Sequence, residues 1–418
     1  LNAYLSQNRG SGKGPALIRI YANSDETEAS LYFGSMHTLP QNGEYSHFSA
    51  ALAHEFAHTL GIMLGHSEGD NAFGSHLSPW EAGLRDIEGE SARPNIPVGV
   101  NGTSEGFFDL GGYYEGSDFP GMIGESYAGV YFTGEHVEEV LDGALIKFPD
   151  ASDKFVPGVP VLGFENLYLY DENGNVYTDA AVELSHIELQ NGLLSHQNWR
   201  NWTTLMEAEL AVMQDVGLKI DRKDWFGHSV YASGEAGTPN VVVNTTPFYA
   251  RNESGTGWLE GVANTNPWGI GLHIYGSYND VTQAADILSE GSYAIGVRVD
   301  GFGNTLRIPA STTIRSDGTE GYGFAVTYGT HHSIVQQGTV AAMGGQGVAA
   351  MFSFGDNMLS NITAERGSYW YTEYLIPYDP AAIGLDGALV DRYDLSGTLA
   401  GGRAAIFIDD NALVRQIN

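Results

Sequence analysis

The stretch His54-Glu55-Phe56-Ala57-His58-Thr59-Leu60-Gly61 lies in an apolar-rich run from Phe48 to Leu64. The residues just before it, Ser49 to Ala53, are mostly good helix formers, so we expect this run to be an α-helix. In a helix His54 and His58 are four residues apart and project from one face, where both imidazoles can reach one metal ion. The pattern therefore predicts a helix that supplies two ligands of a metal site.

The residue after the first histidine suggests the chemistry of that site. Glu55 can lie beside a metal-activated water without binding the metal, where a carboxylate works as general base. Zinc lowers the pKa of its water toward ~7, which suits attack on a peptide carbonyl. Such a pattern can arise by chance in a chain with 13 histidines, but the helical context and Gly61 favour one catalytic Zn2+ ion. We expect peptide-bond hydrolysis.

The composition narrows the class of protein. The chain has 418 residues, 42% of them hydrophobic, which is enough for two or three globular domains. Its net charge of −32 disfavours nucleic acid and anionic membrane surfaces as partners. It contains no cysteine, so a disulfide scaffold and a thiolate metal site are excluded. Neither a signal peptide nor an apolar run long enough to span a bilayer is present, and we expect a processed or trimmed product because the chain opens at Leu1.

Several shorter elements can be placed before residue 224. We expect strands at 16–21 and 29–33, a short helix at 79–86, and a turn and helix at 131–145. Residues 167–177 read as a hairpin turning at 172–175. Asp171, Asn173 and Asn175 have calcium-loop spacing, but Val176 replaces the glycine that such a loop needs, so calcium is not supported. Thr204 and Glu207 have capping-box spacing and predict a helix from about Met206 to Gly217.

The second half of the chain has a different pattern. Strand-like segments led by glycine recur at Gly271, Gly296, Gly323, Gly347 and Gly402, separated by 25, 27, 24 and 55 residues. We interpret the last gap as two periods plus an insertion, and each period as two strands and a turn. Fixed-period strands with glycine turns favour a parallel β-solenoid (β-helix), with a β-sandwich as the alternative. We therefore expect a domain at 1–224, a linker at 225–245 and an all-β domain at 246–418.

A catalytic zinc needs a third protein ligand. The compact motif HExxHxxGxxH would place it at Leu64, so that motif is broken here. His66 and His76 have the wrong spacing, whereas His186 and His196 are distant candidates that each follow a serine. A glutamate on the following helix, Glu207 or Glu209, would suit a gluzincin, but Gly61 would then have no role.

The first half resembles the leishmanolysin-like metzincins. The resemblance rests on Gly61, a long insertion, the dipeptide Ser195-His196, then Leu205-Met206 and a helix ending at Gly217. It implies an α+β metzincin-like catalytic domain with His196 as third zinc ligand and Met206 as the Met-turn residue. The chain departs from the family pattern because no tryptophan directly follows His196 and the segment between Met206 and the helix is almost absent. Ser185-His186 is the rival dipeptide, farther from Met206 and without a tryptophan close behind it.

The second half is similar to the passenger regions of bacterial autotransporters, in strings such as those at 271–276 and 355–359. This likeness implies a β-solenoid that carries a functional domain outward, on a secreted or bacterial cell-surface protein. A membrane barrel would then lie further along the gene, and the lack of cysteine would suit export.

Two functions are consistent with these features. The first is a secreted or surface zinc metalloendopeptidase acting on protein or peptide substrates, including host extracellular proteins. The second is an adhesin in which the protease-like domain and the solenoid form a binding module. Glu55 favours the first, because a module that only binds could lose this residue and keep its fold.

Overall fold

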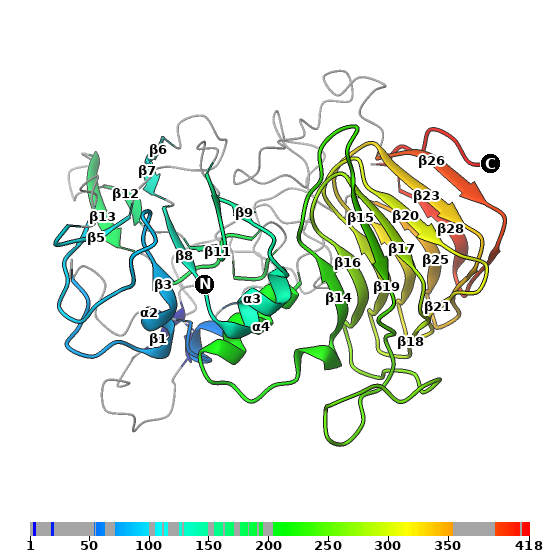
Figure 1. Cartoon of the computed structure of the whole chain (residues 1–418), viewed down its shortest axis with the longest axis horizontal. Coiled ribbons are helices and arrows are strands. Elements are labelled where there is room, and N and C mark those ends of the chain that lie inside the picture. Colours follow the sequence, from blue (N-terminus) through cyan, green and yellow to red (C-terminus); the bar gives the residue numbers. More distant parts are fainter. Residues whose placement is uncertain are drawn as a thin grey trace. The chain divides into compact units, whose positions relative to one another are not determined.

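The computed structural model divides the chain into two compact units, the first ending at Ile220 and the second beginning at Asp221. Figure 1 shows few helices and many strands in both units. In the part that the structure describes, no helix is long and apolar enough to cross a membrane. The described residues are 3–5, 18–20, 54, 56–62, 72–99, 105–110, 113–115, 125–127, 129–148, 154–161, 164–170, 176–182, 184–189, 192–194, 204–353, 389–409 and 412–418.

The N-terminal unit combines short helices with small sheets. Its helices are α2 (Pro79–Gly83), α3 (Glu135–Leu141) and α4 (Glu207–Asp215), and residues 54 and 56–59 are also helical. Its strands pair within five small sheets. These are β1 (Ala3–Leu5) with β2 (Ile18–Ile20); β11 (Val159–Val161), β8 (Val130–Phe132) and β3 (Leu84–Arg85); β13 (Val176–Val182), β12 (Phe164–Tyr170), β7 (Glu125–Tyr127) and β6 (Tyr113–Glu115); β10 (Phe155–Val156) with β9 (Ile146–Lys147); and β4 (Val98–Gly99) with β5 (Phe108–Asp109).

Local signals explain where these helices begin. Ser78 caps α2: its hydroxyl accepts from the Glu81 N–H at 3.1 Å, and the Glu81 carboxylate accepts from the Ser78 N–H at 2.6 Å. The N-cap residue of α3 is Gly134, which has no side chain to cap the helix. The N–H groups of His136 and Val137 donate to the carboxylate of Asp215, at the end of α4. Helices α3 and α4 are thereby fixed to each other.

The expected hairpin is confirmed, because β12 and β13 pair antiparallel from Phe164↔Val182 to Tyr170↔Val176. The expected helices at 79–86 and 131–145 correspond to α2 and α3. The expected strand at 16–21 is β2, whereas the one at 29–33 lies outside the described residues. Helix α4 begins as predicted, but its capping carboxylate is Glu209 and not Glu207, because Glu209 accepts the Met206 N–H at 2.8 Å.

The C-terminal unit contains three parallel sheets and the short helix η3 (Arg222–Asp224). Sheet I consists of β14 (Phe226–Val230), β16 (Ile270–Ile274), β19 (Ile295–Val299), β22 (Tyr322–Val326), β25 (Val348–Phe352) and β28 (Ala404–Ile408). Sheet II consists of β15 (Asn240–Asn244), β17 (Asn279–Gln283), β20 (Thr305–Ile308), β23 (His332–Gln336) and β26 (Val390–Leu395). Sheet III consists of β18 (Ile287–Ser289), β21 (Thr313–Ser316), β24 (Thr339–Ala342) and β27 (Thr398–Gly401).

From β16 onward the chain passes through sheets I, II and III in turn, so that each round forms one coil (Figure 1). This order, with parallel pairing between successive coils, is compatible with a parallel β-solenoid. Each coil contains three strands instead of the expected two, because the strands of sheet III are only three or four residues long and carry little pattern. The 55-residue gap is also a single coil with an insertion, since β28 pairs directly with β25.

Strands β14 and β15 both fall inside 225–245, the stretch expected to be a linker. Each pairs in parallel register with the corresponding strand of the next coil. The run Val241-Val242-Val243 in β15 is typical of a strand, and the strand belongs to sheet II.

Candidate metal centre

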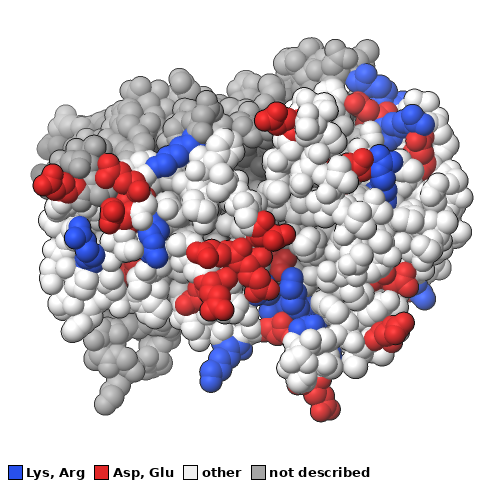
Figure 2. Space-filling view, viewed as in Figure 1, with Lys and Arg blue, Asp and Glu red and all other residues white. Residues whose placement is uncertain are grey.

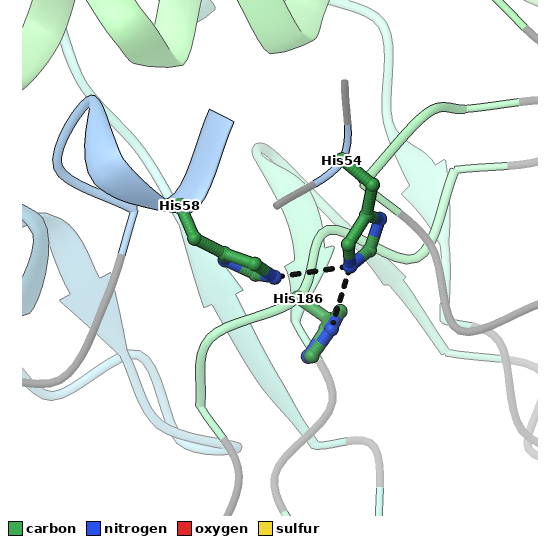
Figure 3. Close-up of side chains that lie close together, drawn as sticks. All are labelled: His54, His58 and His186. Atoms are coloured by element: carbon green, nitrogen blue, oxygen red, sulfur yellow. Dashed lines mark hydrogen bonds between the residues drawn. The ribbon is translucent and has the colours of Figure 1, made fainter. Parts of the chain in front are cut away.

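Three histidines from two distant segments of the N-terminal unit meet at one point (Figure 3). His54 and His58 come from the same helical turn, as the HExxH spacing predicts, and His186 comes from the segment that follows β13. The His54 Nε2 atom lies 3.0 Å from His58 Nε2 and 3.1 Å from His186 Nε2. His54 and His58 are buried, and His186 is half-buried.

The other ring nitrogen of each histidine also has a partner. His54 Nδ1 lies 2.6 Å from the Leu193 carbonyl oxygen, and His58 Nδ1 lies 2.9 Å from the Ile62 carbonyl oxygen. A carbonyl oxygen only accepts, so both Nδ1 atoms donate, and in the neutral rings both Nε2 atoms carry lone pairs. Two lone pairs that face each other at 3.0 Å repel unless a proton or a metal ion lies between them. The three histidines are therefore a group that could hold a metal ion.

The spacing of these atoms fits a small tetrahedral ion. Zinc binds imidazole nitrogen at about 2.0–2.1 Å, which places two nitrogen ligands of a tetrahedron about 3.3 Å apart. Three histidine ligands with a fourth position left for water or substrate form the donor set of a catalytic zinc site. Backbone carbonyls that accept from the distal ring nitrogen are the usual support of such ligands.

The segment that carries His186 is held from both sides. Leu184 has a left-handed backbone with φ 47°, and its carbonyl accepts the Trp80 indole N–H at 2.7 Å. The Glu188 N–H donates to the Pro160 carbonyl of β11 at 2.8 Å. Trp80 is itself fully buried and stacks on Phe132 with ring centroids 4.8 Å apart. These contacts direct His186 toward the other two histidines.

The turn at 192–194 forms hydrogen bonds with the segments that carry the histidines. Besides the Leu193 carbonyl that holds His54, the Leu194 carbonyl accepts the Ile187 N–H at 3.1 Å, next to His186. The N–H groups of Leu193 and Leu194 both donate to the Glu209 carboxylate of α4. One turn thus contacts both the side chain of His54 and the segment that carries His186.

The structure joins some of the predicted site residues and leaves others untested. His54 and His58 lie together, whereas Glu55 and His196 are outside the described residues. Among the described residues, the histidine that completes the cluster is His186, the rival of His196. Met206 is buried immediately before α4, and its N–H binds Glu209. Glu209, considered as a gluzincin ligand, instead binds backbone N–H groups.

The sequence favours His196 as the third ligand because Trp199 and Met206 lie close to it in the chain. The available signal for His186 was its position, because it follows the second strand of a predictable hairpin within a few residues. Strand β13 is paired with β12 along its whole length, so it fixes where the following segment begins, which closeness in sequence to a methionine does not.

Comparisons with protein-family models, with curated proteins and with solved structures found no match for this chain.

Proposed function

We propose that the N-terminal unit is a zinc-dependent peptidase, with His54, His58 and His186 as the metal ligands and Glu55 as general base. The observation that carries the proposal is the convergence of three Nε2 atoms, two of which belong to rings whose Nδ1 atoms donate to carbonyls. The ligand atoms favour zinc over other metals, because three neutral imidazoles are a typical zinc environment.

The residues of the chain have separate roles in this proposal. The Leu193 and Ile62 carbonyls keep His54 and His58 in the tautomer that presents Nε2. When bound, zinc supplies Lewis-acid chemistry, which polarises a peptide carbonyl and makes water acidic near neutral pH. Glu55, next to His54 in the sequence, takes the proton from the attacking water and passes it to the leaving amine. Protein or peptide substrates, and a secreted or surface location, remain part of the same proposal.

The test measures zinc content and peptidase activity on the same purified samples. We expect one zinc per chain in the wild type, loss of zinc in His186→Ala, and retention in His196→Ala, the matched control from the second Ser-His dipeptide. Glu55→Gln is expected to keep zinc and to lose activity by about 10²–10⁴-fold, the usual contribution of a general base.

Each alternative outcome has a clear meaning. Zinc lost in His196→Ala but kept in His186→Ala would assign the third ligand to His196. Zinc bound in the wild type without hydrolysis of casein or of a peptide library would favour the binding-module function. A protein that takes up no zinc would refute the proposal.

A further inference from the structure

Glu209 is a buried carboxylate that accepts hydrogen bonds from three backbone N–H groups. Its side chain has no exposed surface. It accepts the N–H of Leu194 at 2.8 Å, of Met206 at 2.8 Å and of Leu193 at 3.2 Å. Gly192 makes room for it, because a Cβ atom at that position would lie 2.7 Å from Glu209 Oε1. The local sequence is therefore shaped around this carboxylate.

One peptide group connects Glu209 to the metal centre. The Leu194 N–H, which donates to Glu209 Oε1, and the Leu193 carbonyl, which accepts from His54 Nδ1, belong to the same peptide unit. Hydrogen bonds in such a chain polarise one another, so a carboxylate on the N–H strengthens the carbonyl as an acceptor. A stronger acceptor on Nδ1–H makes the opposite Nε2 a better metal ligand.

We propose that Glu209 is a positioning residue of the metal centre, which acts on His54 through the Leu193–Leu194 peptide. The effect of Glu209 on metal binding rests on the proposed function, because it assumes that His54 is a metal ligand. Its structural part, the control of the His54 tautomer and ring orientation, does not depend on the identity of the metal.

The simpler alternative is that Glu209 serves only as the N-terminal cap of α4. A cap needs only the bond to the Met206 N–H, whereas the carboxylate also reaches two N–H groups fifteen and sixteen residues earlier. If capping were its sole role, a substitution would lower helix stability and leave the metal affinity of the folded protein unchanged. The two roles therefore predict different measurements.

The experiment compares Glu209→Gln with Glu207→Gln, a matched control two residues earlier in the same first turn and equally buried. Zinc affinity is measured by competition with a chelator, on samples shown to be folded by circular dichroism. We expect Glu209→Gln to weaken zinc binding by about 10–100-fold, the usual effect of losing an outer support of a ligand, and Glu207→Gln to match the wild type. Equal affinity in all three proteins would overturn the inference.

A second measurement does not require metal. In metal-free protein, imidazole ¹⁵N shifts report which nitrogen of His54 carries the proton. The wild type is expected to show Nδ1–H, and Glu209→Gln a mixture of tautomers; unchanged shifts would overturn the inference even if the helix were weakened. If the wild type binds no zinc, the proposed function fails, and these shifts still decide the role of Glu209.

Should Glu209→Gln fail to fold, Glu209→Asp serves as the second variant. Aspartate keeps the charge and favours a helix N-terminus, but it is one methylene shorter. It is expected to keep the cap and to lose the bond to the Leu194 N–H, with a shift of the His54 signals toward the tautomer mixture. Wild-type signals in Glu209→Asp would overturn the inference.

Discussion

Leu184 has a backbone conformation that costs a residue with a Cβ about 1–2 kcal/mol. It is fully buried with φ 47°, two positions before His186. The surrounding contacts must maintain this conformation, and the Trp80 indole N–H on its carbonyl is one of them. Strain of this kind is often found where a side chain has to point in one direction.

Trp80→Phe tests that contact. The substitution removes the indole N–H and leaves the Leu184 carbonyl buried without this donor, so we expect the free energy of unfolding to fall by about 1–3 kcal/mol. The zinc affinity is expected to fall as well, because the His186 segment loses a constraint. Urea denaturation and chelator competition measure the two effects. Trp268→Phe, at a half-exposed tryptophan of the C-terminal unit, is the control; identical unfolding midpoints for both variants would contradict this account.

At this scale the sequence predicted the pair, and the family resemblance placed the third ligand at His196, not at His186. The spacing of His54 and His58 is set by one helical turn, so the pattern determines their convergence. The position of His186 depends on the hairpin β12–β13, which the sequence predicts, and also on the bridge to β11 and on a left-handed Leu184, which have no local signature. Long-range placement brings His186 to the pair, whereas the predicted ligand His196 lies outside the described residues.

Among the elements, the glycines of sheet I have a packing role. Gly271, Gly296 and Gly323, expected to lead their strands, are each the second residue of a strand. A Cβ on them would lie within 2.6 Å of Ile287, Ile314 or Val340 of sheet III. Phe324 and Phe352 of sheet I pack instead on Tyr393 of sheet II. Contacts reach sheet I from both sides, and all five residues of β16, β19 and β25 are buried.

Gly296→Ala measures how closely sheets I and III approach. The added methyl group would lie 2.4 Å from Ile314 Cγ2 and 2.3 Å from the Gly323 carbonyl oxygen. Overpacking of this kind destabilises by about 1–3 kcal/mol, which we expect in urea denaturation. Gly345→Ala, with no atom within 4 Å of the added methyl group, is the control and should unfold like the wild type. Equal midpoints for the two variants would show that the sheets can separate at no cost.

The regular glycine spacing was enough to predict stacked parallel strands, but not how many strands each coil holds. Strands β18 and β21 of sheet III bury only two side chains each, so their alternation is too short to recognise. These strands form where each coil returns from sheet II to sheet I.

At the scale of the whole molecule, charge governs the response to pH. The chain has 51 acidic and 19 basic residues, and Figure 2 shows acidic groups spread over the face drawn, with basic groups among them. Such exposed charges are screened by salt and contribute little individually. The groups that matter most are buried in the C-terminal unit, where His332 and Asp300 have no or almost no exposed surface.

His332 occupies the end of a column of buried amides. Asn240 donates to Asn279, Asn279 donates to Asn304, and the Asn304 N–H lies 3.3 Å from His332 Nδ1. His332 Nε2 lies 2.8 Å from the Tyr328 carbonyl and donates to it, while Nδ1 accepts the Asn304 N–H, so the ring is neutral. Burial lowers the pKa of His332 from its ordinary 6.5 to about 4.

The sign of the pH dependence follows from this shift. Between pH 6.5 and 4 the unfolded chain binds a proton that the folded chain does not, so stability falls as the pH drops through this range, by up to about 3 kcal/mol. His332→Asn would continue the amide column with a group that does not titrate. We expect calorimetry at pH 7 and pH 5 to show a smaller loss of stability for His332→Asn than for the wild type; equal losses would contradict the prediction.

A second loss of stability is expected at lower pH. Burial alone would raise the pKa of Asp300, but the Arg298 guanidinium and hydrogen bonds from His273 and Thr327 hold it well below its usual range. Its contribution is therefore present above the ordinary carboxyl pKa and disappears as the pH falls below it. Asp300→Asn is expected to remove this acid-dependent loss and to destabilise the unit at pH 7, which denaturation curves at pH 7 and pH 3 would show.

The coil that contains β26 resumes the stack after the intervening residues 353–389. Tyr393 pairs with Ile334 and Ile406 pairs with Ala350, in the same sheets as the preceding coils. Backbone pairing with the preceding coil therefore sets the register of this coil, although 37 residues separate β25 from β26. For a protein engineer, the point between these two strands is a place to insert a foreign peptide for display.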